Sequence, residues 1–320
     1  MHITVAMLGL VFMMSCSNSE HISQALPAGV ERINFTNSTY PRQEGQFTMV
    51  TYNIAGLPAI ISSAQTERPS SISEIGQRLN RFEIVHVQED FNYHNQLVSD
   101  GNNHLFKSSP KGRIPFGDGL NTLSNYPIHD LTRIPWDDCA GADCLTPKGF
   151  TYSKIEVAPH VFVDFYNVHA NAYNNLRAAA ARRRNMEQLS NYIAAHSGKN
   201  AVIVMGDLNG HYSYAYDNIQ LLNTRNGLQD VWVDKVCKSN YPVQSDQEPM
   251  SNILSLGEMN ETIDKILYRS SETIELTPLS YHFENQIFND AQGRPLSDHH
   301  PVSARFEWRM APDCCQDGRE

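Results

Sequence analysis

Short apolar segments rich in β-branched residues recur along most of the chain and limit the folds open to it. They predict strands over residues 47–55, 84–88, 152–157, 161–168, 201–205, 262–268, 273–279 and 302–308. A helical pattern is clear in only two places. The first has Ser71 and Glu74 spaced as a capping box, and the second covers residues 174–196. Many strands with few helices between them favour two packed sheets flanked by helices over a regular parallel array.

The chain of 320 residues is expected to contain one catalytic domain, over residues 46–308. It is flanked by an export segment, a polar lead-in and a cysteine-containing tail, over residues 1–16, 17–45 and 309–320. Residues 3–14 form an apolar run too short to span a bilayer as a helix, and a polar stretch follows at once. This pattern predicts either a cleaved export signal or a lipoprotein signal with lipidation at Cys16. Both alternatives place the mature protein outside the cytoplasm, secreted or anchored to a membrane.

Two cysteines, Cys139 and Cys144, are close enough in the sequence to close a small disulfide loop. Export to an oxidising compartment would permit that bond. A zinc site is the alternative, but no second pair of Cys or His stands at ligand spacing from them. The sequence does not assign partners to Cys237, Cys314 and Cys315.

The charge of the chain bears on the kind of substrate that it can hold. A formal net charge of −10 disfavours a broad cationic surface for long nucleic acids. It does not exclude a nuclease, because a bound metal ion would change the local field. The basic run at residues 182–184 is the strongest argument for nucleic acid. On a helix its side chains fan over most of the circumference, so we interpret it as a solvated helix face.

Polar side chains stand where several of the predicted strands end. Taken singly, an Asn or Asp at such a point is commonly a turn residue. However, strand ends that share one edge of a sheet can bring their side chains into one cleft. Five strand ends carry the pattern, with Asn53, Glu89, His169, Asp207 and Asn209, and Asp298 and His299. Together they predict a functional site.

These residue types suit a metal-assisted reaction at phosphorus. A hard cation such as Mg²⁺ takes oxygen ligands, often only one or two carboxylates, and Glu89 with help from Asn53 could supply them. Mn²⁺, Co²⁺ or Ca²⁺ are alternatives. The metal would polarise a phosphate oxygen and stabilise charge on the leaving oxygen. The predicted chemistry is therefore hydrolysis of a phosphodiester.

The two histidines suit proton transfer. A histidine oriented by a carboxylate can activate water as a general base, and His299 is expected to do so. Its orienting carboxylate stays open between Asp298 and Asp207. His169 is expected to stabilise the phosphorane or to protonate the leaving group, and Asn209 to donate a hydrogen bond to a phosphate oxygen.

The motifs that carry these residues resemble those of the endonuclease/exonuclease/phosphatase superfamily, which includes deoxyribonuclease I and the type-C neutral sphingomyelinases. The similar segments are Thr51-Tyr52-Asn53, Gln88-Glu89, Asn167-Val168-His169, Gly206-Asp207-Leu208-Asn209 and Ser297-Asp298-His299-His300-Pro301-Val302. They occur in the same order from about residue 47 to residue 308. The resemblance implies a four-layered α/β/β/α sandwich with two mixed sheets at its centre. It also implies that Asp264 supports a catalytic histidine.

One stretch is similar to the bacterial sphingomyelinase branch of that superfamily. Residues 138–144, followed by residues 148–152, look like a segment that this branch carries between two central strands. Lys148 in it is a candidate phosphate contact. The resemblance favours a phospholipid headgroup as substrate. The protein is expected to be a monomer. A deoxyribonuclease-like endonuclease and a non-enzymatic binding protein on the same scaffold are the rival hypotheses.

A departure from that branch concerns contact with a membrane surface. Residues 281–288 stand where bacterial members carry an exposed aromatic hairpin, but they contain no pair of Trp residues. Phe283, Ile287 and Phe288 either dip into a bilayer or pack on their own sheet. The sequence leaves both interpretations open.

Overall fold

The computed structural model of the protein describes residues 43–99 and 101–311. The predicted export signal with Cys16, the lead-in up to residue 42 and the tail cysteines Cys314 and Cys315 lie outside the described residues. Among the helices of the described part, none is long and apolar enough to cross a membrane.

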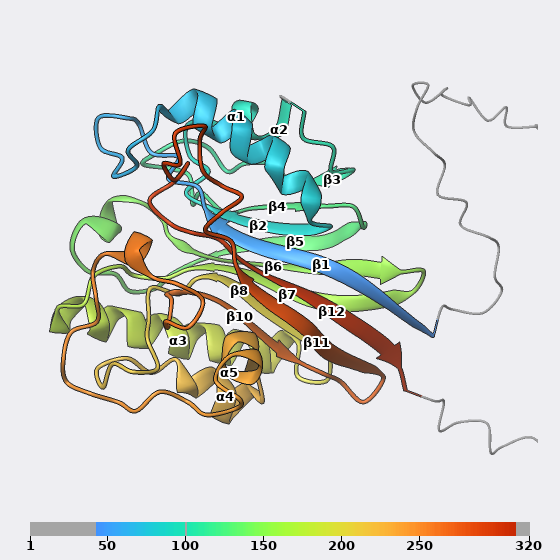
Figure 1. Ribbon diagram of the computed structural model, residues 1–320. Helices are drawn as coiled ribbons and strands as arrows, with labels where there is room; N and C mark the ends of the chain where they lie inside the picture. Colours follow the sequence, from blue (N-terminus) through green and yellow to red (C-terminus); the bar gives the residue numbers. More distant parts are fainter. Residues whose placement is uncertain (1–42, 100, 312–320) are drawn as a thin grey trace, which may run out of the picture. The chain divides into compact units, whose positions relative to one another are not determined.

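Two six-stranded sheets form the centre of the domain (Figure 1). The first has the order β11-β12-β1-β2-β4-β3, with β11 Ile274–Phe283, β12 Val302–Met310, β1 Glu44–Asn53, β2 Ile84–Gln88, β4 Asn121–Ser124 and β3 Phe106–Lys107. The second has the order β5-β6-β7-β8-β10-β9, with β5 Ile128–Pro135, β6 Gly149–Ala158, β7 Val161–His169, β8 Val202–Asp207, β10 Asp264–Arg269 and β9 Gln229–Asp230. Both sheets are mixed, because β1 and β2 are parallel, as are β7 and β8, while the remaining pairs are antiparallel.

Helices cover the outer faces of both sheets, which completes four layers (Figure 1). The first sheet is covered by α1 Arg68–Arg78 and α2 His94–Ser99, and the second by α3 Leu176–His196, α4 Gln220–Asn226 and α5 Val231–Lys235. Short 3₁₀ turns stand at η1 Leu79–Arg81, η2 Gly141–Leu145 and η3 Ile253–Ser255. This arrangement confirms the predicted α/β/β/α sandwich.

The alternation of side chains along β1 separates two apolar cores. Val50 and Tyr52 are buried in one core with residues of α1 such as Ile75. Phe47 and Met49 belong to the other, which contains the apolar side chains of the second sheet. Successive residues of a strand point to opposite faces, so one strand contributes to both layers. Burial of apolar side chains on both faces is the main stabilising term of such a domain.

A buried polar cluster links the two sheets close to the strand ends. The side-chain nitrogen of Gln88 donates to Thr51 Oγ1 at 3.0 Å and to Asn167 Oδ1 at 2.8 Å. The Asn167 nitrogen donates in turn to the carbonyl oxygens of Val87 and Asn121. Because a buried amide is costly when it lacks partners, these bonds fix how the ends of β1, β2 and β7 face one another.

Helix α1 begins earlier than the sequence indicates. Its N-cap is Glu67, whose side chain accepts from the Ser70 amide at 2.9 Å, and Ser71 is buried inside the helix. The prediction of a capping box at Ser71 and Glu74 was wrong. Pro69, in the first turn, explains the earlier start, because its fixed φ and missing N–H suit that position.

Two further interpretations are resolved by burial. Arg182 lies within α3 and is fully buried, so the basic run is not a wholly solvated helix face. Its charge is matched by Asp217, a partner that only the fold brings near. Phe283 and Phe288 are also buried, and Phe288 packs edge-on against Tyr52. These two aromatic side chains therefore pack on their own sheet.

Candidate active site

The predicted polar residues meet at one edge of the two sheets. Asn53, His169 and Asp207 are the last residues of β1, β7 and β8, and Glu89 directly follows β2. Strand β10 runs antiparallel to β8, so its first residue, Asp264, pairs with Asp207. The strand directions thus gather side chains that are far apart in the sequence.

Asn53 joins two carboxylates of the site. Its side-chain nitrogen donates to Glu89 Oε1 at 3.3 Å and to Asp207 Oδ2 at 3.1 Å. Its oxygen accepts from the Ala55 amide at 3.1 Å. In this arrangement Asn53 orients the two carboxylates and turns its own oxygen away from them.

His299 is held by Asp264. Its Nδ1 lies 2.9 Å from Asp264 Oδ2, and its Nε2 lies 3.7 Å from Asp207 Oδ2. The adjacent Asp298 accepts instead from the Ser297 hydroxyl at 3.4 Å. Of the carboxylates considered from the sequence, the structure therefore brings Asp264 to Nδ1 and Asp207 to Nε2.

His169 approaches Asp207 from the other side. Its Nε2 lies 3.5 Å from Asp207 Oδ2, and among the described residues its buried Nδ1 has no hydrogen-bond partner. The His169 carbonyl oxygen accepts from Trp136 Nε1 at 2.7 Å. Asn209, with a positive φ of 51°, donates its side-chain amide to the Ala170 carbonyl at 3.1 Å. It thereby ties the end of β8 to the residue that follows His169.

Burial and neighbouring charges shift the pKa values of the ionisable groups in the site. Burial alone would lower the pKa of His299, but the carboxylates of Asp264 and Asp207 outweigh it and raise that pKa to about 10. Burial raises the pKa of Glu89, and the negative charge of Asp298 raises it further. Burial, with the positive charge of Lys148, holds the pKa of His169 well below its ordinary value. His169 is thus neutral where His299 is charged, as long as the carboxylates carry their full charge.

The donor atoms of the site fit a hard divalent cation. Asp207, Asp264 and His299 each place one ligand atom within 4.8 Å of the others, so this buried cluster could hold a metal ion. Asp264 Oδ1 is buried, and no described residue forms a hydrogen bond with it. The carboxylate of Glu89 adds oxygen ligands on the far side of Asn53. An oxygen-rich set of this kind matches the preference of Mg²⁺.

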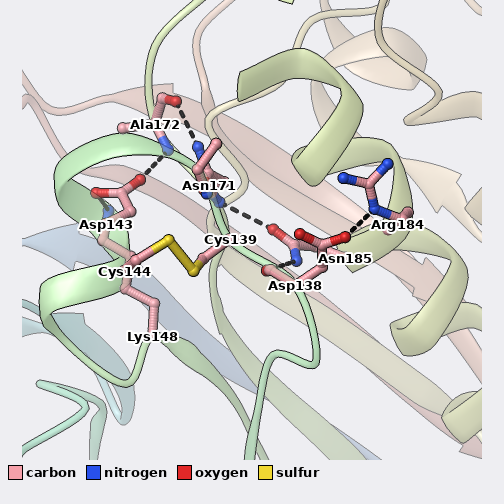
Figure 2. Close-up of a disulfide and its surroundings, with 10 residues drawn as sticks. Asp138, Cys139, Asp143, Cys144, Lys148, Asn171, Ala172, Arg184 and Asn185 are labelled. Atoms are coloured by element: carbon pink, nitrogen blue, oxygen red, sulfur yellow. Dashed lines mark hydrogen bonds and ion pairs between the residues drawn. A yellow bond between two sulfur atoms is a disulfide. The ribbon is translucent and has the colours of Figure 1, made fainter. Parts of the chain in front are cut away.

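Lys148 follows the small loop that the disulfide between Cys139 and Cys144 closes (Figure 2), and it is near enough to His169 and Glu89 for its charge to act on both. Its ammonium lies 3.0 Å from Asp143 Oδ1. The other carboxylate oxygen of Asp143 accepts from the amide of Ala172, in the segment after His169 (Figure 2). Asp143, in the disulfide loop, therefore connects the Lys148 cation to the segment that follows His169.

A cavity of about 440 Å³ opens beside this loop. Its lining includes the apolar side chains of Phe116, Trp136 and Leu145 together with two lysines, Lys111 and Lys148. The sequence did not single out Trp136 or Asp143. Asp143 lies within the segment that resembles the sphingomyelinase branch, which is the one signal that could have drawn attention to it.

Comparison with solved structures defines the class of fold. An endonuclease/exonuclease/phosphatase from Beutenbergia cavernae superposes with a TM-score of 0.56 at 14% identity, over 84% of this chain and 72% of that one. Beta toxin from Staphylococcus aureus with bound magnesium ions gives 0.56 at 17%, over 81% and 99%. D. rerio TDP2 complexed with a single-strand DNA product gives 0.59 at 14%, over 82% and 98%. The described residues have the deoxyribonuclease I-like fold of these proteins.

Sequence comparison identifies a more closely similar group of proteins. No family model matches the chain. Over 272 residues it is 38% identical to the sphingomyelinases of Mycobacterium tuberculosis and Mycobacterium bovis, an alignment that covers 82% of this chain and 53% of each relative. The chain spans about half the length of these curated relatives. Over that part it is a sphingomyelinase homologue.

Proposed function

We propose that the protein is an exported, magnesium-dependent phosphodiester hydrolase that cleaves a phospholipid headgroup, as a sphingomyelinase or phospholipase C does. One observation carries the proposal: the His299–Asp264 pair faces the carboxylates joined by Asn53 at the shared edge of the two sheets. The 38% identity to mycobacterial sphingomyelinases supports the choice of reaction.

His299 is the proposed general base. In its neutral form His299 donates a hydrogen bond from Nδ1–H to Asp264, which leaves Nε2 as the atom that takes a proton from water as the water attacks phosphorus in line. Asp207, 3.7 Å from Nε2, stabilises the imidazolium that forms. The leaving group departs on the side opposite the attacking water.

His169 and Lys148 are proposed to serve the phosphate. His169 stays neutral because burial and Lys148 lower its pKa, so it can donate a hydrogen bond to a phosphate oxygen or to the leaving oxygen. Lys148, whose side chain is 10% exposed, offers a point charge to the same group. Asn209 positions His169 through the Ala170 carbonyl, which uses one of its two amide N–H donors and leaves the other for a phosphate oxygen.

Glu89, oriented by Asn53, is proposed to hold the cation, because Asp264 is already hydrogen-bonded to His299. A divalent cation there would polarise the phosphate and offset the negative charge that raises the pKa of His299. The structural relative with bound magnesium ions makes Mg²⁺ the first metal to test.

The cavity beside Lys148 favours a lipid over a nucleic acid. The cavity lining combines two lysines, Lys111 and Lys148, with the apolar side chains of Phe116, Trp136 and Leu145. Two cations beside apolar side chains suit the phosphate of one lipid headgroup, whereas a nucleic-acid cleft carries Lys and Arg along a longer backbone path. Arg182, the first arginine of the basic run, is buried and paired with Asp217. A deoxyribonuclease-like activity is the alternative, and loss of all catalysis in favour of binding is the third.

A side-by-side assay tests the substrate. The purified protein with Mg²⁺ is incubated with sphingomyelin vesicles and, separately, with supercoiled plasmid. Release of phosphocholine without nicking of the plasmid is expected. Nicking without phosphocholine release would establish the nuclease instead, and cleavage of neither, nor of other phospholipids, would leave the binding hypothesis.

Export is tested separately. The mature chain, recovered from its native source, should begin after the predicted signal and be found outside the cytoplasm. A mass that matches an N-terminal lipidated cysteine would select the lipoprotein alternative at Cys16. Recovery of the uncleaved chain in the cytoplasm would contradict export.

A further inference from the structure

Arg182 is the one residue of the basic run that the proposed chemistry does not use and that the fold buries completely. It sits in the first half of α3, and its neighbour Arg184 is exposed and pairs with Asp138. A fully buried guanidinium is costly unless each of its donors finds a partner. The hydrogen-bond partners of Arg182 show which segments of the chain its burial holds together.

Two of them belong to the segment that follows His169. One guanidinium nitrogen of Arg182, Nη1, donates to the Asn171 carbonyl at 2.9 Å and to the Tyr173 carbonyl at 2.6 Å. The Asn171 side chain accepts from the Ala140 amide at 2.7 Å in the disulfide loop. Arg182 therefore holds the backbone just beyond His169, at Asn171, where the disulfide loop is attached.

The remaining contacts reach the segment that follows Asp207. Arg182 Nε lies 2.8 Å and Nη2 2.7 Å from Asp217 Oδ1, and Asp217 Oδ2 accepts from the His211 amide at 2.9 Å. A Cβ added to Gly210 would stand 3.4 Å from Arg182 Cδ, so the stem of the arginine passes directly against this turn. Asn209, which binds the Ala170 carbonyl, is the residue before that glycine.

We propose that Arg182 is a positioning residue for phosphodiester hydrolysis: it joins the segments after β7 and β8 and so fixes His169 against Asp207 and Asn209. It does not touch substrate. The planar fork of an arginine can bind two carbonyls and a carboxylate in one fixed geometry, and the single ammonium of a lysine cannot. The role rests on the proposed hydrolase activity and extends it to a residue 13 positions along the chain from His169.

The activity test compares the same substitution at two neighbouring arginines. Arg182→Lys should lower kcat, measured per folded molecule on bis-p-nitrophenyl phosphate with Mg²⁺, by about 10- to 100-fold with little change in KM, because misplacement by about 1 Å has that effect. Arg184→Lys, at an exposed position, should keep the wild-type kcat. Equal kcat in both variants would overturn the proposal.

A second variant covers the case in which Arg182→Lys does not fold. Asp217→Asn keeps an acceptor for the His211 amide but removes the charge that holds the guanidinium. It should show the same fall in kcat, and addition of guanidinium chloride at low millimolar concentration to a folded Arg182→Ala variant should restore part of the activity. Full activity in Asp217→Asn, or in Arg182→Ala before any addition, would contradict the role.

Hydrogen exchange separates this inference from the proposed function. Amides of residues 170–173 and 209–213 should exchange faster in Arg182→Lys than in Arg184→Lys, whether or not the wild-type protein hydrolyses a phosphodiester. Faster exchange with an inactive wild type would disprove the hydrolase proposal but support the positioning role of Arg182. Unchanged exchange in both segments would disprove that positioning role.

Discussion

At the scale of single residues, Asp207 is the centre of the site. Its Oδ2 faces Asn53 at 3.1 Å, His169 at 3.5 Å and His299 at 3.7 Å. The carboxylates Glu89 and Asp264 stand on either side, one joined through Asn53 and the other through His299. This order divides the site into a side suited to a cation and a side suited to proton transfer.

Substitution of one carboxylate on each side tests that division. Glu89→Gln should weaken Mg²⁺ affinity at least about tenfold, because even residues that only orient a metal ligand are worth that much. Asp264→Asn should leave Mg²⁺ affinity nearly unchanged but lower kcat by about 10²- to 10⁴-fold, the contribution of a positioned general base. Isothermal titration with Mg²⁺ and steady-state kinetics measure the two effects. The reverse pattern, with metal binding lost only in Asp264→Asn, would place the metal in the Asp207–Asp264–His299 cluster.

At the level of secondary-structure elements, the disulfide loop is attached through more than one bond to the segment that follows His169. Asp143 binds Lys148 and the Ala172 amide (Figure 2). The Ala140 amide donates a hydrogen bond to the Asn171 side chain. On the other side of the loop, Asn185 of α3 donates to the Asp138 carbonyl at 2.9 Å. The position of Lys148 thus depends on the whole loop.

Removal of the disulfide should loosen that loop. The double variant Cys139→Ser with Cys144→Ser is expected to lose roughly 2 kcal/mol of unfolding free energy, the entropic value for a loop this short. Its KM should rise, because Lys148 is held less firmly against the substrate phosphate. Urea unfolding and steady-state kinetics measure both. An unchanged KM, with the disulfide absent by mass, would show that Lys148 does not depend on the loop.

The elements differ in how well the sequence predicts them. The strands that carry the site have apolar, β-branched centres, so β2 and the ends of β7 and β8 could be placed closely. Strand β4 was missed, since Asn121, Thr122 and Ser124 are buried polar residues with no apolar alternation. Their burial is offset by bonds such as Ser108 Oγ to Asn121 Oδ1 at 2.9 Å, which only the fold reveals.

The candidate site was predictable for a similar reason. Polar side chains after apolar strands, together with the family resemblance, named the groups that the structure brings together. The resemblance already gave Asp264 as the support of a catalytic histidine, and the structure shows that this histidine is His299. What the sequence could not supply was the pairing of Arg182 with Asp217 and of Asp143 with Lys148. Each depends on distances between segments that are remote in the chain, which no local pattern encodes.

At the scale of the whole molecule, the packing of the two sheets encloses a titratable group far from solvent. His86, on β2, packs edge-on against Phe165 of β7, and among the described residues its Nε2 has no hydrogen-bond partner. Burial lowers the pKa of His86 from 6.5 to about 3. The folded state therefore stays neutral at His86 while the unfolded state takes up a proton below pH 6.5.

This linkage predicts acid sensitivity. Because the unfolded state binds the extra proton, the stability contribution is lost as pH falls from 6.5 toward 3. His86→Leu should remove it, so that the drop in unfolding free energy between pH 6.5 and pH 5 becomes smaller by about 1.5 kcal/mol. Urea unfolding at the two pH values measures the difference. The same drop in both proteins would show that His86 protonates equally in the folded state.

The protein is proposed to hydrolyse phosphodiesters at one metal-dependent site in which His299 is the general base. The decisive experiment is the hydrolysis of bis-p-nitrophenyl phosphate with Mg²⁺, by the wild-type protein and by His299→Ala, each with and without excess EDTA. We expect cleavage by the wild type with Mg²⁺ alone, and none above background in EDTA or in His299→Ala. Undiminished cleavage in His299→Ala, or in EDTA, would contradict the account.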